Sequence, residues 1–423
     1  MTGRPSSIAI VGGWHQSSVL AAGFAEIGHD VTGIAEPAAA MGLAQGRAPL
    51  FEPGLDDLLA QGIQSGRLRF TSSFQEGLRH AEFVFISIDT PVRDDDTSDL
   101  DLIWRSVEQL AAAPPGTPVV VTAQVPVGTS HEIARRSGRS VAYVPEFLRL
   151  GTALETFRQA DRFVIGADDP DLARRIATIY QPLGRPLHFT TVRTAEMAKH
   201  ASNAFLATSV SFINEISDLC EREGADVKEV AAILKLDRRI GPNAFLSAGL
   251  GFAGGTLGRE IKALQMLGAS HGVATDVFDA VERVNARRVP HMVEILRSSA
   301  GGIRGSRVAV FGLTYKTGTS TLRRSAALTL IGLLVAEGAS VSAFDPLAQP
   351  DETAHLPPFE LHREPAPVLT GASALFLMAP WPDSIPFDAA ASLMARPLLI
   401  DTGNYLDAPA ASAAGFAYHG VGR

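Results

Sequence analysis

The sequence predicts an α/β protein in which parallel-sheet domains at both ends flank a helical middle region. Two short apolar segments, residues 7–13 and 307–313, each reach a glycine, as buried parallel strands do where they turn towards a helix. Each is followed by a helical stretch and by a second apolar segment that starts after Gly28 or Gly338. Both halves therefore begin with a strand–helix–strand unit, which is typical of doubly wound α/β domains.

The remaining segments divide the chain into three predicted domains. Thr194 is expected to cap a helix. This helix is predicted to be long, because residues 201–223 contain neither proline nor glycine. This helix exceeds the usual globular length, so we expect it to bridge domains or to form a dimer interface. We predict an N-terminal Rossmann-like domain at residues 1–193, a central helical dimerisation domain at 194–300 and a C-terminal Rossmann-like α/β domain at 301–423. Further strands of the first domain are expected at residues 83–87, 119–122 and 162–165.

The composition is that of an ordinary soluble globular protein, with 46% hydrophobic and 19% charged residues among 423. A formal net charge of -8 argues against a general surface for nucleic acid or anionic membranes, although a local basic pocket can still hold an anionic ligand. We see neither a signal peptide nor an apolar run long enough to span a bilayer, so we expect a cytoplasmic protein. The single cysteine, Cys220, is interpreted as a buried structural thiol.

Short strings spread over nearly the whole chain carry a resemblance to one enzyme family. Two of them are Pro-Glu-Phe-Leu-Arg at residues 145–149 and the glycine-rich stretch at residues 251–260. The others lie at residues 51–55, 66–71, 90–91, 98–100, 125–129, 161–166, 204–208, 211–215, 239–242 and 312–316. In their order these strings resemble the UDP-glucose/GDP-mannose dehydrogenase family. The resemblance implies an NAD-dependent oxidoreductase, a nucleotide sugar as ligand and a homodimer.

Thr256 is the most informative departure from this family. The family's matching segment reads Gly-Phe-Gly-Gly-Ser-Cys-Phe-Pro-Lys-Asp, and its cysteine attacks the aldehyde intermediate. A thiolate is accessible near neutral pH, whereas a threonine hydroxyl needs a strong base to become a nucleophile. Glu260 replaces the aspartate that supports the cysteine, and Arg259 replaces its lysine. We therefore expect Thr256 to be a hydrogen-bonding or spacer residue, and the step from aldehyde to acid to be lost.

The other catalytic positions of the family are largely present. Glu146 matches the glutamate that works through water as acid and base, and burial can raise the pKa of such a carboxyl towards neutrality. Lys199 and Asn203 match the lysine and asparagine that hold the substrate oxygen and the developing oxyanion. They lie one turn apart on a helix, so they share a face. His200 is expected to be a helix-surface histidine, and Leu150 stands where the family has a second glutamate.

The dinucleotide loop departs from the pattern Gly-x-Gly-x-x-Gly. Gly12 is in place and Gly13 can shift the turn, but Trp14 takes the second glycine position, where a bulky side chain should crowd the phosphate. Ser17 takes the third glycine position. The loop therefore leaves two interpretations open: a rearranged NAD site, or a Rossmann domain that no longer binds the dinucleotide.

The ribose end of the predicted NAD site is also altered. Ala35 replaces the family's acidic residue, and Glu36 is the nearest alternative, although neighbours on a strand point to opposite faces. The family has Ser-Thr where this chain has Ala123 and Gln124, which agrees with loss of the cofactor. The resemblance assigns further cofactor contacts to Thr90, Gln124, Lys316 and Arg323.

The predicted nucleotide-sugar pocket is partly kept. The resemblance assigns substrate contacts to Phe147, Leu148, Arg149, Arg239, Phe245, Gly251 and Phe252. Of these, Arg239 is expected to reach the pocket of the neighbouring subunit. Gly403 stands where the family has an arginine that clamps the sugar nucleotide, so UDP-glucose need not be the substrate. We expect no metal site, because the histidines do not pair with cysteine or histidine at ligand spacing.

Three hypotheses for the function remain open from the sequence. The first is a diverged oxidoreductase acting on a nucleotide sugar or a related phosphorylated alcohol, stopping after a single hydride transfer. The second is a non-catalytic nucleotide-sugar-binding protein descended from such an enzyme. The third is a non-redox lyase or epimerase that uses Glu146 and Lys199. NAD discriminates between them: the first hypothesis needs NAD for turnover, and the second needs none.

Overall fold

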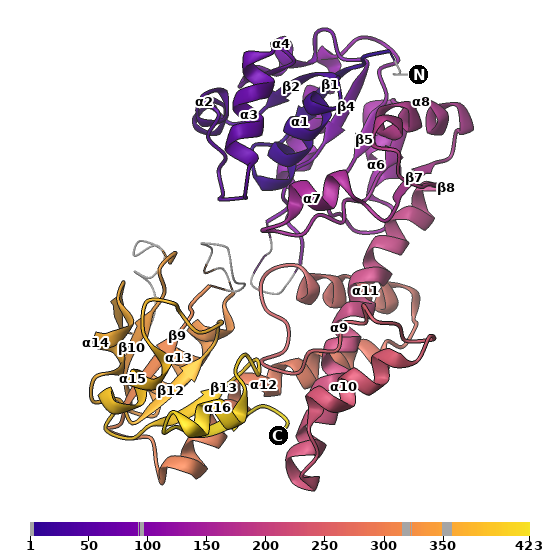
Figure 1. Cartoon of the computed structure of the whole chain (residues 1–423). Coiled ribbons are helices and arrows are strands. Elements are labelled where there is room, and N and C mark those ends of the chain that lie inside the picture. Colours follow the sequence, from indigo (N-terminus) through magenta and orange to yellow (C-terminus); the bar gives the residue numbers. More distant parts are fainter. Residues whose placement is uncertain (1–3, 92, 94–96, 315–321, 323, 349–357) are drawn as a thin grey trace. The chain divides into compact units, whose positions relative to one another are not determined.

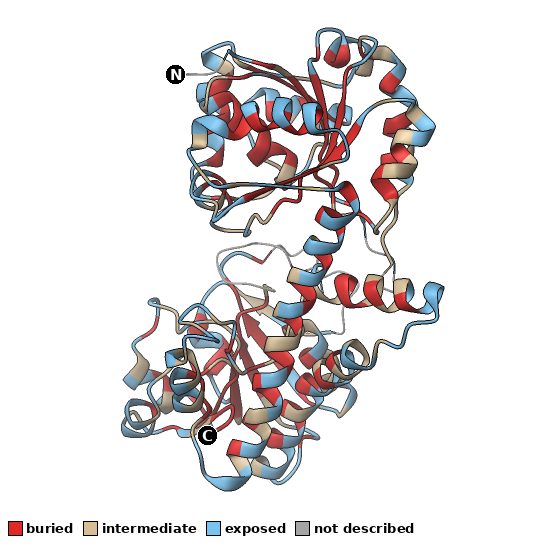
Figure 2. Ribbon diagram, turned by 90° about the vertical axis from the view of Figure 1, so that its right-hand side faces the viewer, coloured by how far each residue is buried: buried red, intermediate tan, exposed pale blue. Residues whose placement is uncertain are grey.

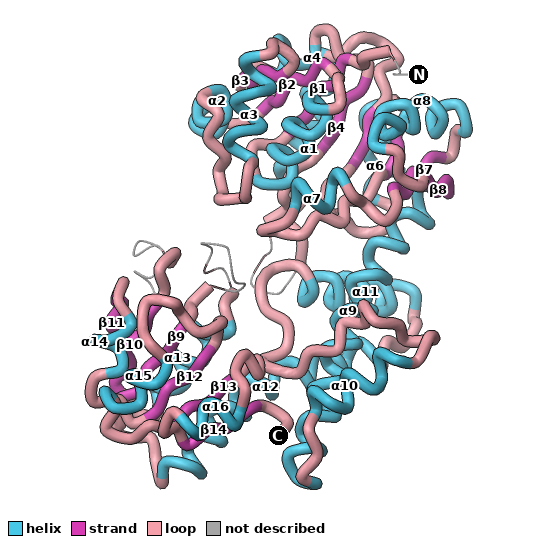
Figure 3. Tube along the Cα trace, in the orientation of Figure 1, coloured by secondary structure: helices cyan, strands magenta, loops and turns pink. Residues whose placement is uncertain are grey.

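The computed structural model describes residues 4–91, 93, 97–314, 322, 324–348 and 358–423. The chain divides into two compact units, Met1–Ala201 and Ser202–Arg423 (Figure 1). Each unit contains one sheet covered by helices (Figure 3). Among the described helices, none is long and apolar enough to cross a membrane.

The first unit has an eight-stranded sheet in the order β3-β2-β1-β4-β5-β6-β7-β8. Its first six strands follow the 3-2-1-4-5-6 order of a Rossmann fold and are parallel, whereas β7 runs antiparallel to β6. The strands are β1 (Ser7–Val11), β2 (Asp30–Ile34), β3 (Leu68–Thr71), β4 (Phe83–Ile86), β5 (Val119–Val121), β6 (Val141–Tyr143), β7 (Phe163–Ala167) and β8 (Leu187–Thr190). The α-helices are α1 (His15–Glu26), α2 (Pro37–Ala44), α3 (Leu55–Gln64), α4 (Phe74–Leu78), α5 (Asp101–Glu108), α6 (Thr129–Ser137), α7 (Ala153–Arg158) and α8 (Pro170–Tyr180).

Helices cover both faces of this sheet, which explains why its central strands β1, β4 and β5 are nearly continuous apolar runs. Along β1, Ile8 and Ile10 pack into one core, and Ala9 and Val11 pack into the core on the other face. This alternation is the period of two that a strand imposes on its side chains. Figure 2 shows the central strands of the sheet as buried elements, with exposed residues on the helices around them.

The second unit contains a six-stranded, fully parallel sheet in the order β11-β10-β9-β12-β13-β14. This is again the 3-2-1-4-5-6 order. The strands are β9 (Arg307–Phe311), β10 (Ser340–Phe344), β11 (Glu360–His362), β12 (Ala374–Leu377), β13 (Leu398–Asp401) and β14 (Ala417–Gly420). The helices are α10 (Val227–Leu236), α11 (Leu257–His271), α12 (Asp276–Ala300), α13 (Ala326–Ala336), α14 (Pro365–Leu369), α15 (Phe387–Leu393) and α16 (Ala408–Ala413).

The long helix predicted in the middle of the chain is α9 (Val192–Glu223), with 32 residues. The predicted cap at Thr194 is wrong. Thr191 precedes the helix, and its Oγ1 accepts a hydrogen bond from the Thr194 amide at 3.3 Å, so Thr191 supplies the capping oxygen. Both residues are threonines three positions apart, and the sequence alone does not show which of them lies outside the helix.

The predicted fold class is confirmed, with an α/β nucleotide-binding domain at each end and helices between them. The predicted strands at both ends of the chain are present. Cys220 is buried, as expected for a structural thiol. The boundaries of the three predicted domains stay a prediction.

Candidate functional site

The turn between β1 and α1 requires both of its glycines. Gly12 has φ +146°, and a Cβ at this position would lie 2.4 Å from the carbonyl oxygen of Ser87. A Cβ on Gly13 would lie 2.7 Å from the Cβ of Ala35. Gly13 therefore lets the loop pack closely against the end of β2, which a side chain would prevent.

Trp14 is the N-cap residue of α1, and 46% of it is exposed. Ser17 accepts a hydrogen bond from the Trp14 amide at 3.0 Å and donates one to the Trp14 carbonyl at 2.8 Å. Ser17, at the third glycine position, is thus a buried capping residue. The amides of His15, Gln16 and Ser17 belong to the first turn of α1, where a helix offers no internal acceptor and its dipole favours an anion.

These residues fit the pyrophosphate of a dinucleotide at the level of the backbone, because the turn and the first-turn amides are kept. The ribose side differs. Ala35 is buried at the end of β2, and the exposed Glu36 follows it as the N-cap residue of α2. Thr90 donates its hydroxyl to the Gln124 carbonyl at 2.9 Å, which joins two predicted cofactor loops. The predicted contacts Lys316 and Arg323 lie outside the described residues.

Glu146 follows β6 and is almost completely buried. Burial raises the pKa of its carboxyl to about 8, and the positive charge of Lys199 lowers this value only in part. The Lys199 Nζ donates a hydrogen bond to the Glu146 carbonyl oxygen at 2.5 Å and lies 4.7 Å from the ring centroid of Phe147. The structure therefore brings together Glu146, Phe147 and Lys199, three residues predicted from the sequence.

Leu148 and Arg149 continue the loop after Glu146. With Glu146 and Phe147 they line a small, partly open cavity of about 50 Å³. The other side of this cavity comes from Phe157 and from the segment that leads into β7.

The first turns of α9 hold the loop at residues 125–130, which was not predicted from the sequence. The fully buried carboxylate of Glu196 accepts hydrogen bonds from the amides of Gly128 at 2.6 Å and Ser130 at 2.9 Å. His200 lies one turn further along the helix, and its Nε2 is 2.9 Å from the Val125 carbonyl oxygen. The expectation of a surface histidine is therefore wrong: His200 is buried, because the 125–130 loop covers this face of α9. Glu196 and His200 lie four residues apart and so share one face of the helix, and this spacing was the only signal in the sequence for their common role.

Three predicted catalytic residues belong to the second unit. Asn203, on α9, is buried, and its Nδ2 has no hydrogen-bond partner among the described residues. Thr256 is the exposed N-cap residue of α11, and its side chain makes no capping hydrogen bond. Glu260 is fully buried one turn later, with its Oε1 4.0 Å from the Nε of the buried Arg259. The carboxylate of Glu260 is thus paired with a cation next to it in the sequence.

The glycine-rich segment before Thr256 is held by α12. A Cβ on Gly251 would lie 2.2 Å from the Asn285 Oδ1, so this position requires glycine. Asn285 accepts a hydrogen bond from the Phe252 amide at 2.8 Å and donates one to the Phe252 carbonyl at 3.0 Å. The buried Arg288 donates to the Gly249 carbonyl at 2.9 Å. Asn285 and Arg288 were not found from the sequence, because they lie on a separate helix.

The remaining predicted substrate residues are exposed. Arg239 forms an ion pair with Asp237 at 2.6 Å, and Phe245 is half exposed. At Gly403, a Cβ would lie 2.4 Å from the ring of Tyr405, so a larger residue at this position would require the ring to move.

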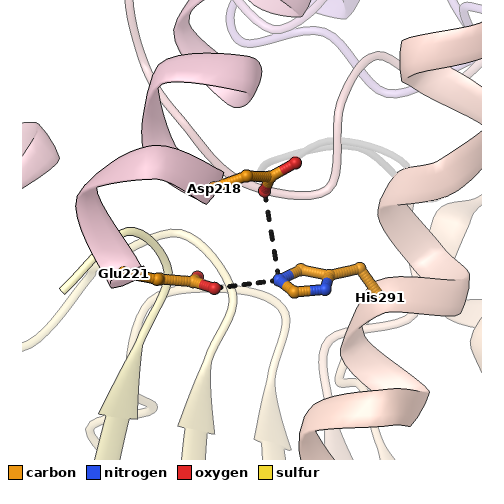
Figure 4. Close-up of side chains that lie close together, drawn as sticks. All are labelled: Asp218, Glu221 and His291. Atoms are coloured by element: carbon orange, nitrogen blue, oxygen red, sulfur yellow. Dashed lines mark hydrogen bonds and ion pairs between the residues drawn. The ribbon is translucent and has the colours of Figure 1, made fainter. Parts of the chain in front are cut away.

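One group of potential metal ligands, Asp218, Glu221 and His291, comes from α9 and α12 (Figure 4). The His291 Nε2 lies 3.0 Å from the Glu221 Oε2, and this hydrogen bond raises the pKa of His291. Glu221 also accepts a hydrogen bond from the Gly422 amide at 2.9 Å, and Asp218 is paired with the buried guanidinium of Arg288. Both carboxylates have partners: ion pairs join α9 to α12, and the hydrogen bond from Gly422 joins α9 to the segment after β14.

Comparison with known proteins agrees with this architecture. Family models match in chain order: the NAD binding domain at residues 6–184, the central domain at 193–287 and the UDP binding domain at 309–408 of the UDP-glucose/GDP-mannose dehydrogenase family. The UDP-glucose 6-dehydrogenase of Rhizobium meliloti (strain 1021) is 38% identical, covering 98% of this chain and 99% of the relative. UDP-glucose 6-dehydrogenase YwqF of Bacillus subtilis (strain 168) is 34% identical, covering 99% and 98%.

Among solved structures, a UDP-glucose dehydrogenase from the hyperthermophilic archaeon Pyrobaculum islandicum is similar with a TM-score of 0.87 and 31% identity, covering 99% of this chain and 98% of that one. The predicted resemblance is thus confirmed over both sheets and the helices between them. With all three family domains matched in order and relatives of this identity along the full chain, the protein belongs to the UDP-glucose/GDP-mannose dehydrogenase family.

Proposed function

We propose that this protein oxidises a CH–OH group of a nucleotide sugar with NAD and stops after one two-electron step. The observation that carries the proposal is the environment of Thr256. No hydrogen bond is present at its hydroxyl among the described residues, and the buried Glu260 is paired with Arg259. A threonine hydroxyl without a base is a poor nucleophile, so no covalent intermediate forms with the aldehyde.

The chemistry of the first step falls to Glu146, Lys199 and Asn203. With its pKa raised to about 8, Glu146 is a suitable acid and base near neutral pH, because it can both take up and return a proton through water. Lys199 and Asn203 share one face of α9, where an ammonium group and an amide can stabilise a substrate oxygen as it becomes negative. When bound, NAD supplies the hydride acceptor. The proton of the oxidised hydroxyl then goes to Glu146.

We further propose that NAD binds more weakly here than in an ordinary Rossmann dehydrogenase. The turn at Gly12 keeps the backbone donors, but Trp14 adds a large side chain beside them and Ala35 offers no ribose acceptor. Glu36 is the acidic group left to contact the ribose, because it is exposed directly after Ala35.

The proposed assembly is a homodimer built on α9. Phe205, Phe212 and Leu219 recur at every second turn of this helix and are 72%, 47% and 59% exposed. An apolar stripe with this repeat is typical of a helix that packs against another helix. The exposed Arg239 is then available to the pocket of the partner subunit.

The test is a product assay with a panel of UDP-, GDP- and TDP-sugars. We expect one NADH per substrate consumed and an aldehyde or ketone that can be trapped with a hydrazine. Two NADH per substrate together with a uronate would overturn the single-step proposal. Binding of a sugar nucleotide, measured by calorimetry, without any turnover in the presence of saturating NAD would instead favour a non-catalytic binding protein.

A further inference from the structure

Tyr180, the last residue of α8, carries a hydroxyl group that is fully buried and unpartnered. The residue has no exposed surface, and its hydroxyl forms no hydrogen bond within the described part of the chain. Its ring packs on Phe163 with a centroid separation of 4.6 Å and contacts Phe24 edge-on at 5.5 Å. A buried hydroxyl without a partner costs free energy, so a group that pairs with it in some state of the protein is expected.

The carboxyl group of Glu146 contains a buried acceptor atom. Its Oε1 is buried without a hydrogen-bond partner among the described residues. An ionised carboxylate in such a place needs donors far more than a neutral carboxyl does, because its lost hydration must be replaced. Glu146 has to ionise in order to accept a proton.

The two groups lie near each other. Phe163 lines the small cavity beside Glu146 and also packs directly on the Tyr180 ring. Burial is the main cause that raises the pKa of the Tyr180 hydroxyl, and the charge of Glu146 raises it further, so the carboxylate is within electrostatic reach of the phenol. Glu146 lines the cavity of about 50 Å³, so space lies beside this residue.

We propose that the Tyr180 hydroxyl donates a hydrogen bond to the Glu146 carboxylate when Glu146 ionises, and so acts as a positioning residue for it. The bond fixes the orientation of the carboxylate from the side of α8. It also stabilises the ionised form and thereby sets the pH range in which Glu146 accepts a proton. Its catalytic consequence rests on the proposed function, whereas the bond itself does not.

Other charged groups face Glu146 from neighbouring segments. Lys199 approaches from α9, while Arg149 comes from the same loop and Asp161 and Arg162 line the cavity. Lys199 stabilises the ionised carboxyl by its charge, and its Nζ donates to the backbone oxygen of Glu146. Tyr180 thus offers a neutral donor in addition to this cation.

The test measures the pKa of Glu146 in the full-length protein without substrate or NAD. An infrared pH titration follows its carboxyl band, which is assigned by its loss in Glu146→Gln. We expect Tyr180→Phe to raise the pKa of Glu146 by about one to two units, which is a tenfold to hundredfold change in its ionisation constant. A pKa that falls, or that stays within about 0.3 of a unit, overturns the proposal.

Tyr418→Phe is the matched control, because it removes a hydroxyl that donates to Asp401 at 3.1 Å in the second unit. It should leave the pKa of Glu146 unchanged, and an equal shift in both variants would contradict a specific bond from Tyr180. If Tyr180→Phe does not fold, 3-fluorotyrosine at position 180 is the second variant. Its more acidic hydroxyl is a stronger donor and should lower the pKa of Glu146, and no change would overturn the proposal. Since the titration needs no turnover, absence of dehydrogenase activity would contradict only the proposed function.

Discussion

Replacing Glu146 by glutamine should make the stability of the protein less dependent on pH. The pKa of Glu146 rises from its ordinary 4.5 to about 8 in the folded protein, because burial disfavours its charge. The folded state therefore holds the proton more tightly than the unfolded state. This contribution to stability is fully present below about pH 4.5 and is lost as the pH rises towards about 8.

A rise of about 3.5 units corresponds to about 5 kcal/mol at most, and about 4 kcal/mol of this falls between about pH 5 and pH 9. Glutamine has a similar shape and cannot ionise. The free energy of unfolding of Glu146→Gln, relative to the natural protein, should therefore increase by several kcal/mol over this interval. The same substitution should abolish proton uptake and with it most of the turnover.

The assay is urea unfolding of both proteins at about pH 5, 7 and 9 and at one ionic strength, followed by circular dichroism. Glu155→Gln is the control, because Glu155 is an exposed carboxyl on the neighbouring helix α7. It should show no such pH dependence. If the difference between Glu146→Gln and the natural protein stays constant within about 1 kcal/mol from about pH 5 to 9, the reasoning from burial is wrong.

Three further predictions concern the cofactor turn, the cysteine position and the dimer. Trp14→Gly should tighten NAD binding by about tenfold or more in calorimetry, whereas micromolar binding by the natural protein would contradict our interpretation of Trp14. Thr256→Cys alone should form no uronate, because Glu260 is one methylene longer than aspartate and NAD must bind twice; acid from this single variant would show that the cofactor turn is competent. Phe212→Glu should convert a dimer to a monomer in light scattering, while Phe189→Glu, at an exposed position outside α9, should not.

The sequence was sufficient for the fold because its signals are local and repeated. The apolar runs that became β1 and β9 each reach a glycine and are followed by a helix, and this order alone implies a parallel sheet. The strings around Glu146 and Thr256 identified the family, and the resemblance predicted the catalytic positions. The substitutions Trp14, Ala35 and Thr256 were also visible in the sequence, as departures from an expected pattern.

Other features required the tertiary structure, since they depend on contacts between distant segments. His200 was predicted to lie on a helix surface, and only the 125–130 loop, which Glu196 anchors, makes that face an interior. Asn285 and Arg288 support the glycine-rich segment from α12, and nothing in their local sequence marks that role.

The raised pKa of Glu146 and the burial of the Tyr180 hydroxyl also depend on contacts between distant segments. The sequence determines which side chains are present and the hydrophobic periodicity of each helix and strand, because propensity and hydrophobic pattern act over a few residues. Desolvation, hydrogen-bond partners and the pairing of charges are set by whichever segments fold against a group. Those properties, on which the chemistry of the site depends, were therefore decided only by the tertiary structure.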